Sequence, residues 1–120
     1  MQKLGKNLGS YNGEAIDIGS VLSDIRQSAR KAGWVFESIQ AAPGLELQSW
    51  RRPSAQLRKR IYISAGIHGD EPAGPLAARQ LVEENLWPPD VEIVLFPCLN
   101  PTGFPLNRRE NAQEIDLNRQ

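Results

Sequence analysis

Apolar residues recur along this chain with two different periods, and each period predicts a type of secondary structure. In the first part of the chain the spacing is helical and lies between a capping side chain, Asp17 or Ser20, and a stop at Gly33. The residues at this spacing are Val21, Leu22, Ile25 and Ala29. We therefore expect a helix that ends near Ala32, after a loose lead-in over residues 1–13.

An alternating pattern follows this helix. Apolar and polar residues alternate over residues 34–39 and again over residues 45–50, as they do in half-buried strands. Ala42-Pro43-Gly44 supplies a turn between the two segments, so the stretch predicts a β-hairpin. Residues 51–60 are basic and contain Pro53, which predicts a solvated surface connection.

The second half of the chain predicts a strand, a helix and another strand. Residues 61–65 are β-branched and aromatic, which favours a buried strand, and residues 91–96 favour a strand buried on both faces. A helix between them begins at Pro72 and ends near Asn85. Its apolar stripe consists of Leu76, Ala77, Leu81 and Val82. A right-handed crossover of this length places the two strands parallel.

The charge composition gives no indication of a highly charged partner. The 14 Lys and Arg residues balance the 14 Asp and Glu residues, which argues against nucleic acid or an anionic membrane as partner. The single cysteine, Cys98, excludes an intramolecular disulfide and fits a reducing compartment. No apolar run approaches the roughly 20 residues of a membrane span, and residues 1–14 lack the apolar core of a signal peptide. We expect a cytoplasmic protein.

The only histidine of the chain follows the strand at residues 61–65. His68 and Glu71 lie in a turn that contains Gly69, and the imidazole and the carboxylate are both good zinc ligands. Open α/β sheets place active sites in such loops, at the C-terminal ends of their strands. The alternative is a surface turn in which Asp70 and Glu71 only cap the helix that begins at Pro72.

A second group of polar residues follows the strand at residues 91–96. Asn-Pro-Thr-Gly at residues 100–103 has turn chemistry, and Arg108, Arg109 and Asp116 come after it in a long loop. An arginine can bind a carboxylate with two hydrogen bonds or stabilise a developing oxyanion. The alternative is that the arginines are solvated and Asp116 pairs with one of them.

These motifs resemble a known family in their order and spacing. His-Gly-Asp-Glu at 68–71, Asn-Pro-Thr-Gly at 100–103, Arg-Glu-Asn-Ala at 109–112 and Asp-Leu-Asn-Arg at 116–119 are similar to those of the zinc carboxypeptidase (carboxypeptidase A-like) family. They are most similar to its bacterial branch, which includes murein peptide amidases. The resemblance covers about half of the chain and implies the N-terminal half of that α/β fold, with a mixed, largely parallel sheet and flanking helices.

The resemblance also implies roles for individual residues. His68 and Glu71 would be ligands of Zn²⁺, and Arg109 would polarise the scissile carbonyl. Asn118 and Arg119 would hold the terminal carboxylate of a peptide or acyl-amino-acid substrate. The implied activity is hydrolysis of an amide bond next to a free carboxylate, by a metallocarboxypeptidase-type enzyme. The related N-acyl amino acid deacylases, aspartoacylase and succinylglutamate desuccinylase, share the same motifs and are the nearest alternative.

The chain departs from this family pattern at three points. Glu114 stands where the family usually has glycine, and Arg108 precedes Arg109, which leaves the choice of carbonyl-binding arginine open. The third departure concerns the metal site: the family's third zinc ligand, a histidine, and its general-base glutamate lie further downstream, and this chain has one histidine. Within the family pattern, Asp116 would orient its neighbours rather than react.

We therefore expect residues 1–120 to form a single, incomplete domain that is inactive alone. An uncovered sheet edge would favour self-association. A non-catalytic module that binds carboxylates is the alternative from a different functional class.

Overall fold

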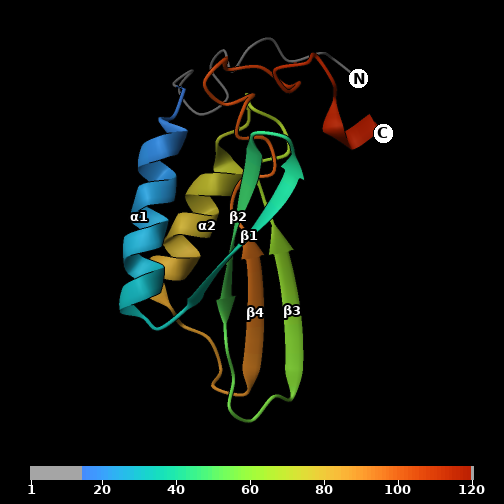
Figure 1. Ribbon diagram of the computed structural model, residues 1–120. Coiled ribbons are helices and arrows are strands. Elements are labelled where there is room, and N and C mark those ends of the chain that lie inside the picture. Colours follow the sequence, from blue (N-terminus) through green and yellow to red (C-terminus); the bar gives the residue numbers. More distant parts are fainter. Residues whose placement is uncertain (1–14, 120) are drawn as a thin grey trace.

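The structure is a computed structural model that describes residues 15–119, so the lead-in expected at residues 1–13 lies outside the described residues. It contains two helices, a four-stranded sheet and a short 3-10 helix (Figure 1). In chain order these are α1 (Ile18–Lys31), β1 (Val35–Ala42), β2 (Leu45–Arg52), β3 (Lys59–Ser64), α2 (Ala73–Glu84), β4 (Val91–Phe96) and η1 (Leu117–Arg119). Each helix and strand expected from the sequence is present.

The sheet is mixed, and its strand order is β1-β2-β4-β3. The hairpin β1–β2 is antiparallel and β3–β4 is parallel, as expected from the turn and from the crossover helix. β2 also pairs antiparallel with β4. The mixed α/β class is confirmed, but only one of the three described strand pairings is parallel, because the hairpin joins the sheet through its second strand.

Helix α1 begins where the sequence predicts. Of the two candidate caps, Asp17 is the one that acts, since its Oδ1 accepts a hydrogen bond from the Ser20 backbone N–H at 3.2 Å. Gly33 follows the helix with φ +83°, a left-handed conformation that favours glycine. The buried face of the helix consists of Ile18, Val21, Ile25 and Ala29.

The predicted apolar stripe of α2 is partly wrong. Ala77 is exposed and Leu81 is 38% exposed, whereas Val82 is buried and Leu76 packs against the core. The buried face of the helix consists of Pro75, Ala78 and Val82. In the first turn of α2, Gly74 lies close to the chain after β3, where a Cβ would be 3.2 Å from the Gly66 nitrogen and 3.3 Å from the Ala65 Cβ.

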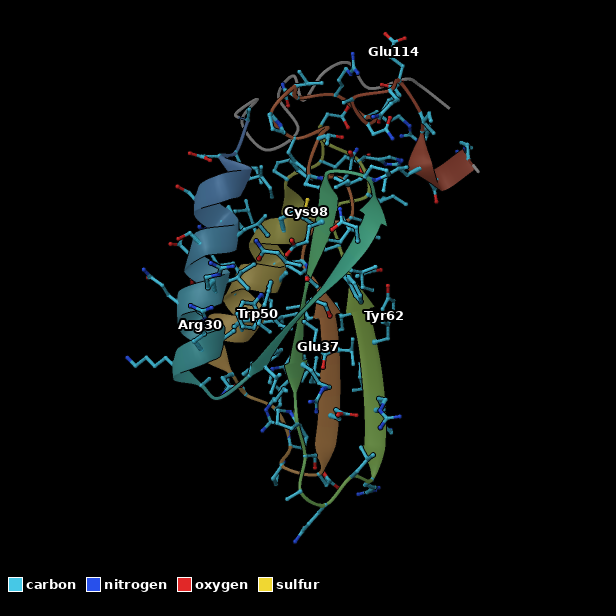
Figure 2. All side chains as sticks on the ribbon, viewed as in Figure 1. Arg30, Glu37, Trp50, Tyr62, Cys98 and Glu114 are labelled. Carbon is cyan, nitrogen blue, oxygen red and sulfur yellow. The ribbon has the colours of Figure 1, made fainter. Side chains whose placement is uncertain are left out.

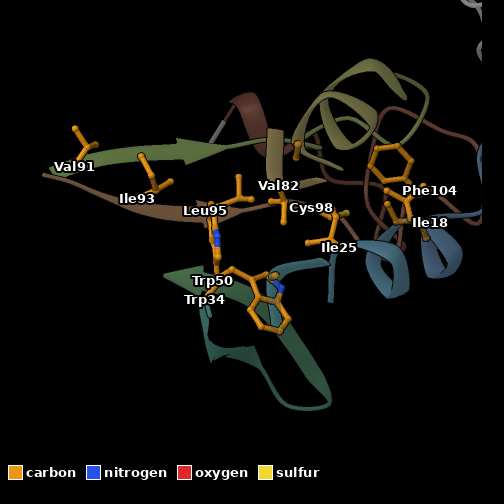
Figure 3. Packing of buried hydrophobic residues seen from close by; sticks show 13 residues of the cluster. Ile18, Ile25, Trp34, Trp50, Val82, Val91, Ile93, Leu95, Cys98 and Phe104 are labelled. Atoms are coloured by element: carbon orange, nitrogen blue, oxygen red, sulfur yellow. The ribbon is translucent and has the colours of Figure 1, made fainter. Parts of the chain in front are cut away.

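One core joins the helices to a face of the sheet. Trp50 and Ile93 are fully buried, and Leu95 is 1% exposed. Figure 3 shows Trp34 and Trp50 close to Leu95, beside residues of both helices. The Trp50 ring also packs against Phe36, with 5.0 Å between the ring centroids. The hairpin is therefore bound to the central strand by aromatic packing as well as by backbone hydrogen bonds.

Strand β3 differs from its prediction, because the structure places it at an edge of the sheet. Ile61 and Ile63 pack against the core, but Tyr62 is 62% exposed on the other face, beside Phe96 (Figure 2). β4 lies between β2 and β3 and is the strand buried on both faces, as expected. Within residues 15–119 one side of β3 is unpaired, and association of two chains through it stays a prediction.

The face of the sheet opposite the helices carries a charged network around Glu92. This carboxylate accepts hydrogen bonds from Arg60 Nε and, at 3.2 Å, from Arg51 Nη1, and Arg51 Nε also donates to Glu37 at 3.1 Å. The hydrogen bond from Arg60 and then that from Arg51 lower the pKa of Glu92, against the opposing effect of its burial. The basic stretch at residues 51–60 is thus partly strand, and two of its arginines pair with Glu92.

Acid should weaken the fold through this network. Because the folded-state pKa of Glu92 lies below its ordinary value of 4.5, its pairing adds stability that is fully present above pH 4.5 and lost as pH falls through the lowered pKa. Glu92→Gln should therefore be less stable than the wild type at neutral pH, with a gap that shrinks below pH 4.5. Urea unfolding across this range measures the gap. The exposed Glu46→Gln is the control, and an equal acid response in both variants would contradict the prediction.

Over residues 15–119, neither helix has the length and apolar character needed to cross a membrane.

Candidate active site

Three segments meet at one end of the sheet. They are the loop after β3 (residues 65–72), the loop after β4 (97–107) and the chain from 108 to 119 (Figure 1). Because β3 and β4 are parallel, their C-terminal ends lie at the same edge, and the polar residues that follow them meet there. This is the edge at which the sequence predicts a site.

His68 lies at the centre of this group and is 6% exposed. Its Nδ1 is 3.3 Å from Glu71 Oε2, and its Nε2 is 3.1 Å from Asp116 Oδ1. Asp116 comes from a segment 48 residues further along the chain. The imidazole is therefore held between two carboxylates, one on each ring nitrogen.

Arg109 completes the group through Asp116. The Arg109 Nε donates to Asp116 Oδ2 at 2.7 Å, and Arg109 Nη1 is 3.9 Å from Glu71 Oε1. The guanidinium is the main cause that lowers the pKa of Asp116 to about 2, and hydrogen bonds from the Asn118 backbone and from His68 add to it. The same pairing raises the pKa of Arg109. Asp116 and Arg109 are both fully ionised at neutral pH.

The ionised state of Asp116 fixes the proton on His68. An ionised carboxylate can only accept, so the 3.1 Å contact with Asp116 requires a hydrogen on His68 Nε2. The other ring nitrogen, Nδ1, lies 3.3 Å from the Glu71 carboxylate. A ring nitrogen and a carboxylate oxygen at this distance are held together by a proton or by a cation between them.

The two residues fit a zinc ion on chemical grounds. Imidazole nitrogen and carboxylate oxygen are both zinc ligands, and metal-binding histidines usually donate their other N–H to a carboxylate, as His68 does to Asp116. A catalytic zinc site commonly has three protein ligands. Within the part of the chain that the structure describes, no cluster of three or more His, Cys, Asp and Glu side chains is arranged to hold a metal, so these residues offer two ligands.

The alternative role of this turn, as a helix cap, is not observed. The N-cap position of α2 is Pro72, and no side chain makes a capping hydrogen bond there. Glu71 faces His68 instead. Asp70 Oδ1 is buried and has no hydrogen-bond partner among the described residues, and this desolvation is the main cause that raises the pKa of Asp70. The turn therefore carries a buried carboxyl oxygen beside the two candidate ligands.

The two neighbouring arginines have different partners. Arg109 pairs with Asp116, which contacts His68, whereas Arg108 donates from Nη2 to the Asn111 carbonyl at 2.8 Å and so holds its own loop. Asn118 and Arg119 lie on η1 with exposed side chains, and the Asn118 backbone N–H donates to Asp116 Oδ1 at 3.0 Å. Their predicted role in binding a carboxylate stays a prediction.

Cys98 lies close to this end of the sheet but is 3% exposed. Burial raises the pKa of its thiol to about 12, so the thiol is protonated at neutral pH. A protonated, buried thiol is a poor nucleophile. Cys98 is therefore part of the core rather than of the candidate site.

Glu114, the residue that replaces the family's usual glycine, has a left-handed backbone with φ +63°. Its side chain is 83% exposed and points away from the protein (Figure 2). Its nearest charged partner is Arg108, at 3.9 Å. The loop thus keeps a conformation that favours glycine although a residue with a Cβ occupies it.

Glu114→Gly should stabilise the fold. Removing the Cβ relieves a conformational cost of about 1–2 kcal/mol, and the extra freedom of glycine in the unfolded chain offsets about 0.5–1 kcal/mol of that gain. We expect a net increase of about 0.5–1 kcal/mol in the free energy of unfolding, measured with urea. Glu114→Ala is the control, because it keeps the Cβ and removes only the carboxylate. Equal stability of the two variants would contradict this account of the strain.

Comparison with known proteins places these motifs in context. The family described as Succinylglutamate desuccinylase/Aspartoacylase catalytic domain matches residues 58–120. Among curated proteins, Carboxypeptidase SOL1 of Arabidopsis thaliana is 37% identical over 125 residues. That match covers 86% of this chain and 24% of the plant protein, so the chain spans about a quarter of the relative's length.

Solved structures share the fold. A protein of Shewanella amazonensis that bears the name metallopeptidase has a TM-score of 0.70 and 25% identity, over 83% of this chain and 39% of that one. A metallo-carboxypeptidase from Pseudomonas aeruginosa, in complex with (2-guanidinoethylmercapto)succinic acid, has a TM-score of 0.61 and 23% identity. It covers 82% of this chain and 30% of that one, and at this identity it supports the fold alone.

Proposed function

Because this chain belongs to the succinylglutamate desuccinylase/aspartoacylase catalytic-domain family, within the zinc carboxypeptidase-like proteins, we propose that it forms part of a zinc-dependent hydrolase site. The reaction is hydrolysis of an amide bond next to a free carboxylate. The observation that carries the proposal is that His68 Nδ1 faces the Glu71 carboxylate at 3.3 Å, while Asp116 holds the ring at Nε2. The buried, unpaired Cys98 fits a reducing compartment, which supports a cytoplasmic location.

Each residue of the group has a distinct part in this site. His68 and Glu71 hold the metal, which when bound supplies an activated water and a Lewis acid. Asp116 holds the proton on His68 Nε2 and so keeps Nδ1 free for the metal. Arg109, fixed through its Nε, presents its Nη atoms to the oxyanion that develops at the carbonyl. Asn118 and Arg119 bind the substrate carboxylate.

The third zinc ligand cannot be a second histidine of this chain, because His68 is the only one. The candidate ligands that the described residues bring together are His68 and Glu71, so we propose that residues 1–120 alone bind zinc and substrate but do not hydrolyse. By itself, the chain should therefore act as a module that binds carboxylates without catalysis.

The substrate is either a peptide with a free terminal carboxylate or an N-acyl amino acid. The matching family bears the names of two deacylases, whereas the curated relative is a carboxypeptidase. Both substrate classes present the same carboxylate to Asn118 and Arg119. Titration of the zinc-loaded chain with an N-acyl amino acid, with a short peptide and with the amide of each distinguishes them, and equal binding of the amides would contradict a carboxylate site.

Zinc calorimetry tests the proposal directly. We expect the wild-type chain to bind one equivalent of zinc, His68→Ala to lose this binding, and the exposed Glu84→Ala to keep it. Two ligands leave the affinity weaker than that of a site with three protein ligands. Absence of wild-type binding, or equal binding by His68→Ala, would contradict the proposal.

A further inference from the structure

The side chain of Asn100 connects the three segments of the site. It is 1% exposed. Its Nδ2 donates to the carbonyl of Ile67 at 3.2 Å and lies 3.3 Å from the carbonyls of both Arg109 and Glu110. Its Oδ1 accepts from the Gly103 N–H at 3.0 Å. One amide thus bonds to the loop after β3, to its own loop after β4 and to the segment from residue 108 onward.

The partners of Asn100 are next to the residues of the proposed site. Ile67 directly precedes His68, and the Arg109 carbonyl belongs to the residue whose guanidinium pairs with Asp116. We propose that Asn100 is a positioning residue that sets the distance between His68 and Arg109. Its role deepens the proposed function, but its geometry can be measured without zinc.

Asparagine suits this position because its side-chain amide carries a hydrogen-bond donor, Nδ2, and an acceptor, Oδ1, at the same distance from the backbone. Three backbone carbonyl oxygens converge on the Nδ2, and without a donor they would face one another unpaired. Asn100→Asp keeps the shape and the acceptor for Gly103 but turns a carboxylate oxygen toward these carbonyls. That substitution therefore removes the donor with almost no change of volume.

The segments around this contact are closely packed. A Cβ at Gly103 would lie 2.6 Å from the Glu110 carbonyl oxygen and would also collide with the Asn100 side chain. A second bond helps to fix the same loop, since the Ala112 N–H donates to Thr102 Oγ1 at 3.1 Å. The Asn-Pro-Thr-Gly turn thus acts as the anchor of the Arg109 segment rather than as a simple connection.

The test follows the Nε–H groups of arginines by NMR. Arg109 Nε donates to Asp116, while Arg51 Nε and Arg60 Nε donate to carboxylates on the sheet face opposite the core. In Asn100→Asp, we expect hydrogen exchange at Arg109 Nε to be about tenfold faster or more. Exchange at Arg51 and Arg60, which serve as internal controls in the same spectrum, should stay unchanged.

A merely structural role is excluded with Val82→Ala, a cavity variant in α2 at a residue that is 1% exposed. This variant loses stability without touching the site, so hydrogen exchange at its Arg109 Nε should keep the wild-type rate, as exchange at Arg51 and Arg60 does. An Arg109 Nε exchange rate in Asn100→Asp equal to that of the wild type would overturn the proposal. So would an equal acceleration in Asn100→Asp and Val82→Ala.

A measurement on the wild type covers the case in which Asn100→Asp does not fold. The Asn100 side-chain amide protons should exchange far more slowly than those of the exposed Gln56, and equal rates would overturn the proposal. Failure of zinc binding in calorimetry would count against the proposed function only, because neither exchange measurement uses the metal.

Discussion

Trp50→Ala should lower the free energy of unfolding by about 3–5 kcal/mol, the usual cost of truncating a large buried aromatic residue. Trp50 is fully buried, packs against the tilted Phe36 ring with 5.0 Å between the centroids, and pairs with Leu95 of β4. It therefore joins the hairpin to the part of the sheet that carries the site. Since small domains have a total stability of about 5–15 kcal/mol, this single change would remove much of it.

Urea unfolding of Trp50→Ala measures this loss. Leu86→Ala provides a matched control, because Leu86 is also large and apolar but is 82% exposed. Its truncation should change the free energy of unfolding by less than about 0.5 kcal/mol. A loss below about 1 kcal/mol for Trp50→Ala would contradict the location of the core.

Gly69→Ala should disrupt the site as well as the fold. Gly69 lies between the two candidate ligands, and a Cβ there would collide with the backbone of Gly103 and with the carbonyl of Arg108. Backbone cannot rotate away as a side chain can, so the loops must separate, at a cost of about 1–3 kcal/mol. Because Gly69 lies in the turn between His68 and Glu71, moving this turn away from the other loop should change the relative position of the two ligands, and zinc binding should be lost even where the variant remains folded.

Gly44→Ala is the control for this prediction. Gly44 has φ +75° but open space around its Cβ position, so its substitution costs only conformational strain, of about 1–2 kcal/mol. We expect Gly44→Ala to lose stability and keep zinc binding. Equal zinc binding by Gly69→Ala and the wild type, in calorimetry, would show that the close packing of the loops is not needed for the site.

The sequence predicts the local elements well because their signals are local. The helical spacing, the Asp17 cap and the turn at Pro43 each act within a few residues, and each is confirmed in α1 and in the hairpin. The position of a strand in the sheet depends on contacts far along the chain. An apolar sequence such as that of β3 has the same pattern at an edge as at the centre, so the edge position of Tyr62 could not be predicted.

The same limit applies to the site. The order of the motifs in the sequence identified His68, Glu71 and Asp116 as candidate site residues. The resemblance implied the family of the chain, which the comparisons confirm. The sequence left open which arginine faces them, because Arg108 and Arg109 are adjacent and identical in chemistry. Asn100 could be read from the sequence only as a turn residue, since its three carbonyl partners lie on segments up to 33 residues away.

Heteronuclear NMR of the single imidazole tests the central claim most directly, because every histidine signal of this chain comes from His68. The account predicts that adding zinc changes the nitrogen shift of Nδ1, while Nε2 keeps its proton, bonded to Asp116. An Nδ1 shift that does not respond to zinc, or loss of the Nε2 proton to the metal instead, would contradict the proposed site.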